Sequence, residues 1–193
     1  MQGSYFYLDI LPKNLPNCMK LRYYRWKKLV LFALGLFLGT AFCMKWMEGD
    51  LWVNNEKFTI LGLEYFYSKE KLQGILSILD HRVQTILRYH LYFDFAFMAG
   101  VYPGIMSLCM MAREKLSFTI FRKILFLLAI FQLFAWAADI TENYYLLLWI
   151  KKPVIGNEFE WYHVIVAIKW IIALAGALLS IPVVLRKKSM KTN

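Results

Sequence analysis

Three carboxylate side chains occur inside the most apolar stretches of the sequence. Asp94 lies within LYFDFAFMAGVYPGIMSLCMMA, and Asp139 and Glu142 lie within ILFLLAIFQLFAWAADITENYYLLLWI. A carboxylate at membrane depth costs about 2.5–3.5 kcal/mol unless it is paired, protonated or hydrated. Each of these acids is therefore a candidate functional group for the chemistry of a proton, a cation or a polar ligand.

Four apolar segments must position these acids. Crossing a hydrocarbon layer of about 30 Å takes about 20 helical residues. Hydrophobic residues make up 60% and aromatic residues 18% of the 193 residues, more than a soluble domain of this length needs. The expected spans are residues 29–47, 89–112, 124–150 and 161–185. The sequence thus predicts an all-α membrane protein, with a four-transmembrane-helix bundle over residues 29–185.

Basic residues are concentrated beside alternate ends of these segments. They precede the first span, fill the loop between the second and third spans, and follow the fourth span. The positive-inside rule then places both termini in the cytoplasm, including a basic and aromatic lead (residues 1–28) and a basic tail (residues 186–193). The net charge is +10. Nucleic-acid binding is nevertheless not expected, because basic clusters beside a membrane ordinarily contact anionic lipid headgroups.

The outer loop, residues 48–88, is the segment that we expect to fold outside the hydrocarbon layer. Strand-forming residues on both sides of Asn54 and Asn55 predict a small β-hairpin. From Ser68, a fair N-cap, apolar residues at helical spacing predict an amphipathic helix of about 20 residues. This helix should lie in the outer interface and continue into the second span.

Depths along the expected spans bring the acids and one lysine to a similar level. At 1.5 Å per residue, Asp94, Asp139 and Glu142 lie about 8–16 Å below the outer ends of their helices, and Lys169 about 10–12 Å below. On the third span, Gln132, Asp139 and Asn143 share one helix face. The predicted binding residues are Asp94, Tyr102, Gln132, Asp139, Glu142, Asn143 and Lys169, with His90 and His163 as accessory candidates.

Three carboxylates against one lysine leave an acidic excess. Either one carboxylic acid is protonated, through desolvation and like-charge repulsion, or a cation, a water or a ligand amine supplies the missing partner. Two simpler interpretations stay open. In one, Lys169 pairs with Asp139 or Glu142 only to lock the helix packing. In the other, Glu142 and Asn143 lie close enough to the surface to be hydrated.

Small residues four apart predict close helix packing, because they let another backbone approach. Gly35 and Gly39 have this spacing in the first span, Gly100 and Gly104 have it in the second, and Gly176 belongs to a similar set in the fourth. These glycines either pack the helices of one protomer or form the interface of a homo-oligomer.

Catalytic and metal-binding motifs are absent from the sequence. There is no Gly-rich phosphate loop, GxSxG, HExxH or paired CxxC. Cys18, Cys43 and Cys109 fall at different depths on the expected topology, so we expect no disulfide. We also expect no metal site and no cofactor.

Three runs, KFTILGLEYFYSKEKLQGIL, LYFDFAFMAGVY and AADITENYYLL, resemble a group of small bacterial four-helix membrane proteins. That group has an Asp-to-Tyr element in its second span and an Asp-x-x-Glu-Asn element in its third. The matching residues here are Asp94, Tyr102, Asp139, Glu142 and Asn143. The resemblance implies the four-helix fold and a bacterial inner membrane, but no reaction.

A second likeness is architectural. The long first outer loop, the acid and the proline in the second span, and the acids near the outer end of the third are similar to the emopamil-binding and sterol-isomerase class. This likeness implies a pocket for an amphiphilic amine or a sterol.

Together these patterns predict a non-enzymatic membrane protein. Its acidic pocket would bind or pass a small cation, a proton or an amphiphile, or the protein would regulate a membrane partner. Two alternatives from other classes stay open. One is an intramembrane lipid- or sterol-modifying enzyme with Asp94 as general acid or base. The other is an oligomerising structural or membrane-permeabilising subunit.

Overall fold

Four long helices dominate the computed structural model, which describes residues 17–186, with side chains from residue 21 onward. They are α1 (Asn17–Met47), α3 (His81–Lys115), α4 (Thr119–Lys151) and α5 (Glu158–Leu185). All four are long and apolar enough to cross a membrane. The prediction of an α-helical integral membrane protein is confirmed at this level.

The helices begin earlier than the apolar segments that predicted them. α3 begins at His81 rather than at residue 89, because Asp80 caps it: the Asp80 carboxylate accepts a hydrogen bond from the backbone nitrogen of Val83 at 2.8 Å. The expected amphipathic helix of about 20 residues is therefore wrong in its second half. Its first half is α2 (Lys69–Ser77), and the remainder forms the first turns of α3.

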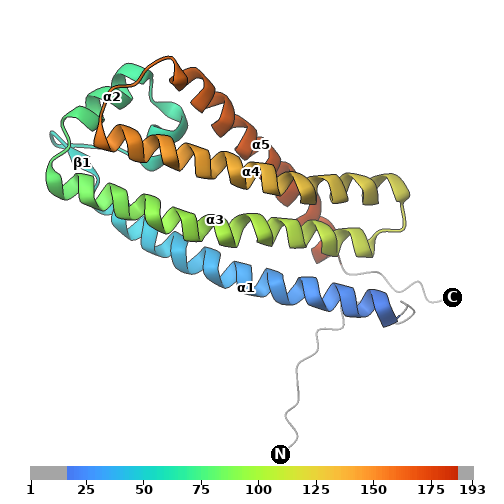
Figure 1. The fold of residues 1–193 in the computed structure, drawn as a ribbon. Helices are drawn as coiled ribbons and strands as arrows, with labels where there is room; N and C mark the ends of the chain where they lie inside the picture. The colour runs from blue at the N-terminus through green and yellow to red at the C-terminus, as the bar shows by residue number, and fades with distance from the viewer. Residues whose placement is uncertain (1–16, 187–193) are drawn as a thin grey trace, which may run out of the picture.

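α3 is the central helix of the bundle (Figure 1). α1 packs along one side of α3, whereas α4 and α5 pack against α3 and against each other. A Cβ atom at Gly100 would lie 2.8 Å from the backbone nitrogen of Phe37, so a glycine permits the close approach of α1. Met98 and Tyr102 are buried with Ala135 of α4. Positions 98 and 100 are about 200° apart around a helix, which separates the two packing faces.

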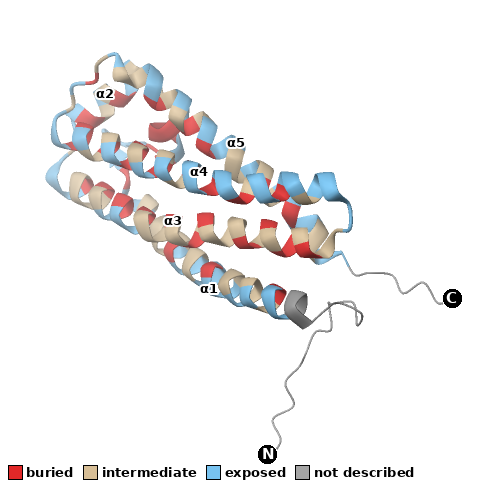
Figure 2. Cartoon of the chain, turned by 45° about the vertical axis from the view of Figure 1, so that its right-hand side comes forward, coloured by how far each residue is buried: buried red, intermediate tan, exposed pale blue. Residues whose placement is uncertain are grey.

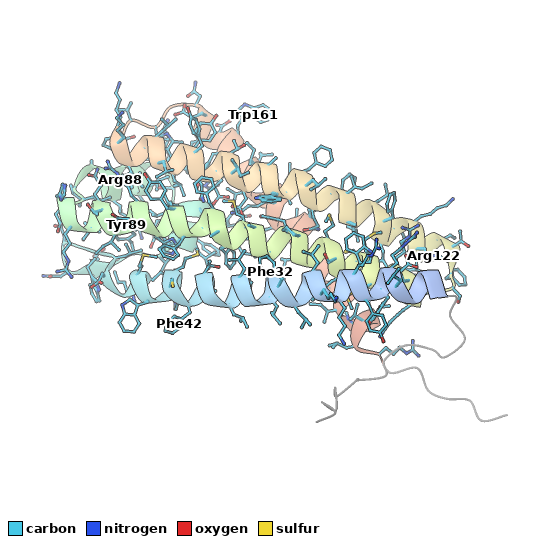
Figure 3. The ribbon with its side chains drawn as sticks, turned by 60° about the horizontal axis from the view of Figure 1, so that its bottom comes forward. Phe32, Phe42, Arg88, Tyr89, Arg122 and Trp161 are labelled. Atoms are coloured by element: carbon cyan, nitrogen blue, oxygen red, sulfur yellow. The ribbon has the colours of Figure 1, made fainter. Side chains whose placement is uncertain are left out.

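α1 is the most exposed of the four helices. Only 11% of its most apolar stretch is buried, against 39% for α3, and Figure 2 shows the same contrast. Its Phe42 points away from the bundle in Figure 3. A Cβ atom at Gly35 or Gly39 would meet nothing within 4 Å, so packing within the protomer is wrong for these two glycines. Gly104 and Gly176 do lie against neighbouring helices.

Short elements between α1 and α3, together with the α4–α5 connection, form a cap over one end of the bundle (Figure 1). The elements are η1 (Glu48–Asp50), β1 (Trp52–Val53), β2 (Glu56–Lys57), η2 (Gly62–Phe66) and α2. Asn54 and Asn55 turn the chain between the antiparallel strands with φ of 49° and 65°. η2 is a single π-helical turn that follows the antiparallel strands. An apolar core holds the cap on the helices and includes Leu51, Phe58, Leu63, Leu72, Leu87, Trp149 and Tyr162.

Candidate functional site

Three helices present polar side chains at one level of the bundle. Asp94 lies about 20 Å along α3 from its cap end, Asp139 about 18 Å along α4, and Lys169 about 17 Å along α5. These positions are close to the middle of each helix, displaced toward the cap. Because the helices pack side by side, their polar groups meet inside the protein rather than facing lipid.

Lys169 stands at the centre of this group. Its Nζ lies 2.7 Å from Asp139 Oδ1, 2.5 Å from Glu142 Oε2 and 3.5 Å from Glu64 Oε2. None of these four residues is more than 7% exposed. We call them the Lys169 cluster. Removing such charges from water costs several kcal/mol per ion, so the cluster depends on how well its members satisfy one another.

Asp139 is the best-satisfied acid of the Lys169 cluster. Lys169 Nζ donates to its Oδ1, and the Tyr102 hydroxyl donates to its Oδ2 at 2.7 Å. Both carboxylate oxygens of Asp139 therefore accept a directed hydrogen bond.

Glu142 lies in a different environment. Its Oε2 is close to the ammonium, yet neither of its oxygens has a well-directed hydrogen bond from any described residue. The contact with Lys169 is therefore electrostatic, at an angle outside the favourable range for a hydrogen bond. Of the two acids of α4 that contact Lys169, Glu142 therefore has fewer directed hydrogen bonds than Asp139.

The charges of the cluster do not balance. Three carboxylates around one ammonium would leave two negative charges in excess inside the protein. Burial raises the pKa of Glu64 above its usual range, and the positive charge of Lys169 opposes that rise only in part. Holding protons on the carboxylates removes the excess without another ion.

Asp94 and Asn143 form a second polar pair beside the cluster. Asn143 Nδ2 donates to Asp94 Oδ2 at 2.7 Å and to the carbonyl oxygen of Leu91 at 3.5 Å. Asn143 Oδ1 has no donor among the described residues. An amide offers both a donor and an acceptor, and its orientation is interchangeable by a flip. A protonated Asp94 would donate to that oxygen, so the pair suits either protonation state.

The remaining predicted residues lie outside these contacts. Gln132 Nε2 donates to the carbonyl oxygen of Ile172 at 3.1 Å, which ties α4 to α5. His163 stacks on Tyr65 of the cap, with ring centroids 5.8 Å apart. His90 is buried one turn from Asp94, and its Nδ1 has no partner in the described part of the chain.

The interpretation in which Glu142 and Asn143 lie near the surface and are hydrated is wrong. Glu142 and Asn143 are both fully buried, with 0% exposure. The simple pairing of Lys169 with one acid is also incomplete, because Lys169 contacts Asp139, Glu142 and Glu64 together.

Glu64 is the member of the cluster that sequence reasoning missed. It lies in the π-helical turn η2 of the cap, not in a spanning helix. The Tyr162 hydroxyl donates to the carbonyl oxygen of Leu63 at 3.3 Å and fixes this turn against α5. A signal was present in the sequence, because Glu64 is the lone charge in the apolar run ILGLEYFY. The criterion that identified Asp94 would have selected Glu64 as well.

Fold and site together define an integral membrane protein with an enclosed cluster of carboxylates around a lysine. Among residues 17–186, no three His, Cys, Asp or Glu side chains are grouped to hold a metal ion. No family model, curated protein or solved structure was found to match this chain. The two resemblances drawn from the sequence therefore stay predictions.

Proposed function

We propose that this chain is an integral membrane protein that binds and exchanges protons at the Lys169 cluster. The observation that carries the proposal is the convergence of Glu64, Asp139 and Glu142 on one buried ammonium, within 3.5 Å of Nζ. Like charges this close cannot all be ionised at low cost, so protons must be taken up as the site forms.

A proton suits this site better than the other small cations or the amphiphile also expected from the sequence. The carboxylates converge on Lys169 Nζ, which already occupies the point where a metal ion would lie. A proton instead resides on a carboxylate oxygen and needs no separate cavity. Glu142 is the natural acceptor, because its oxygens have no directed donors among the described residues.

Glu64 is the proposed route between the cluster and the membrane surface. It is carried by the cap, whereas Asp139 and Glu142 are carried by the spanning helix α4. Its neighbours Tyr65 and Phe66 are exposed, while Glu64 itself is buried. Proton exchange along this route requires a movement of η2 that uncovers the Glu64 carboxyl group.

The charge distribution supports an orientation with the cap outside. Arg113, Lys115, Arg122 and Lys123 lie at the end opposite the cap, as Figure 3 shows for Arg122. The positive-inside rule then assigns that end, and both termini, to the cytoplasm. The bacterial inner membrane is the location implied by the resemblance to small bacterial proteins.

Infrared difference spectroscopy on the protein in lipid tests the proposal directly. A step in pH should change the carbonyl stretch of protonated carboxylic acids in the wild type. Glu142→Gln should remove most of that band, whereas Glu56→Gln, a change to an exposed carboxyl in the cap, should leave it in place. If no protonated-acid band responds to pH, or if the band survives Glu142→Gln and Glu64→Gln together, the proposal is wrong.

Proton passage can be measured separately. Vesicles containing the protein and a trapped pH dye should acidify faster than empty vesicles after an external acid step. Asp139→Asn should slow this acidification, because it removes the carboxyl group that pairs with Lys169 at 2.7 Å. Equal rates in the two kinds of vesicle, with a normal infrared response, would mean that the site binds protons without passing them across the membrane.

A further inference from the structure

A groove runs along the junction of α1 and α3 on the lipid-facing side. Its inner part is an apolar hollow of about 240 Å³, bounded by Ala33, Leu34 and Phe37 of α1 and by Gly104 and Leu108 of α3. Gly104 lines this hollow and lies against Ala33 of α1, since a Cβ atom at Gly104 would be 3.2 Å from the Cβ atom of Ala33. The lining is almost entirely apolar, as a hydrocarbon chain requires.

The groove continues into a second hollow at the basic end of the bundle. This hollow, of about 480 Å³, is bounded by Arg22, Arg25, Trp26 and Leu29 of α1 and by Met110 of α3. Leu29 precedes Val30 of the first hollow, so the two hollows follow each other along the same pair of helices.

The two ends of the groove differ in chemistry. Arg25 is exposed and makes no ion pair within the described residues, whereas Arg22 lies 3.7 Å from Glu114. The indole nitrogen of Trp26 is buried and has no acceptor in the described part of the chain. Two guanidinium groups and an indole N–H thus offer donors for an anion at the level where headgroups lie.

We propose that this groove binds one anionic phospholipid, with its phosphate at Arg22 and Arg25 and an acyl chain along Leu34 and Gly104. From Arg25 to Phe37 the helix rises about 18 Å. That length is close to one leaflet of a hydrocarbon core of about 30 Å. The charged end and the apolar hollow therefore have the separation of a lipid headgroup and its chain. This inference does not depend on the proton chemistry of the Lys169 cluster.

Native mass spectrometry of the full-length protein tests the site. The protein is released from mixed micelles that contain phosphatidylglycerol and phosphatidylcholine in equal amounts. The wild type should retain one phosphatidylglycerol molecule preferentially. Arg25→Gln should weaken this retention about fivefold, the effect of one basic group near a lipid surface. Lys28→Gln is the matched control, because Lys28 is an exposed basic residue of α1 outside the groove, and it should change retention less than about twofold.

Filling the apolar hollow gives an independent test. Leu34→Trp should lower retention of the lipid as strongly as Arg25→Gln, whereas Leu31→Trp should not, since both leucines are exposed on α1 but only Leu34 lines the hollow. Circular dichroism and size-exclusion profiles establish that each variant is folded.

Three results would overturn the proposal. The first is an equal loss of retention in Arg25→Gln and Lys28→Gln, which indicates unspecific attraction to the basic end. The second is normal retention in Leu34→Trp. The third is a lipid-free dimer that Leu34→Trp dissociates, which would mean that a second copy of the chain occupies the groove.

Discussion

Replacing Lys169 by methionine is the sharpest test of the cluster, because methionine keeps most of the side-chain volume and removes the charge. Lys169 contacts Asp139, Glu142 and Glu64, and all four residues are buried. Removing one partner of a buried ion pair costs about 3–5 kcal/mol when the other partner stays charged. We therefore expect a loss of stability of that size at alkaline pH.

The same substitution should cost much less in acid. Without the ammonium, the buried carboxyl groups hold their protons to higher pH, so the folded variant binds more protons than its unfolded chain. Stability then falls as pH rises, by about 1.4 kcal/mol per pH unit for each extra proton bound. Below about pH 4, close to the pKa of a carboxyl group in an unfolded chain, these acids become protonated in both states, and the loss shrinks toward the 0.5–1.5 kcal/mol, roughly, of a lost hydrogen bond.

Unfolding of the detergent-solubilised protein, followed by circular dichroism at about pH 3.5 and about pH 8, measures both numbers. Lys45→Met is the matched control, since Lys45 forms an exposed pair with Glu48 at 2.6 Å and should contribute less than about 1 kcal/mol at either pH. A loss for Lys169→Met that is the same at both pH values would refute the reasoning. So would a loss no larger than that of Lys45→Met.

Three further perturbations test other contacts of the structure. Glu64 has a raised pKa through burial, so its ionisation destabilises the fold as pH rises above the unfolded value; Glu64→Gln should flatten the fall of the thermal midpoint with pH, and Glu56→Gln should not. Tyr102→Phe removes the hydroxyl that donates to the cluster, and chemical unfolding should show a loss of about 1–3 kcal/mol. Gly100→Leu would force α1 away from α3 and should lower stability by about 1–3 kcal/mol, whereas Gly35→Leu meets open space and should leave the unfolding midpoint unchanged.

Hydropathy was enough to predict the membrane helices, but not where they begin. The residues from 17 to 28 and from 81 to 88 are helical, yet charged residues interrupt both segments, so neither has the hydropathy of a membrane span. Their helical conformation is instead set by continuation of the neighbouring helix and by one cap, Asp80 at α3. Asp80 also fits the polar face of the longer amphipathic helix that the sequence predicted from Ser68 onward. The sequence around Asp80 therefore fits both a continuous amphipathic helix and a new helix capped by Asp80, and the structure has the capped helix.

The site was predictable to the extent that helix geometry determines it. The depth of each acid follows from residue counts, and the spacing of Asp139 and Asn143 places both on one face. Which acids share Lys169 depends on how the helices rotate about their axes, and a single sequence carries no signal for that rotation. The contact of Glu64 with Lys169 could not be predicted from helix geometry, because it depends on how the cap folds over the bundle.

The two proposed sites are separated by the geometry of α3. Positions 94, 98 and 102 turn toward α4 and α5, where Asp94 and Tyr102 join the buried polar groups. Positions 100 and 104 turn toward α1, where both glycines permit close packing and both line the groove. α1 contributes no residue to the Lys169 cluster. Because the two sets of residues share no partner, we expect the two sites to be independent. The double variant should lose lipid retention to the same extent as Arg25→Gln alone, and proton binding to the same extent as Glu142→Gln alone.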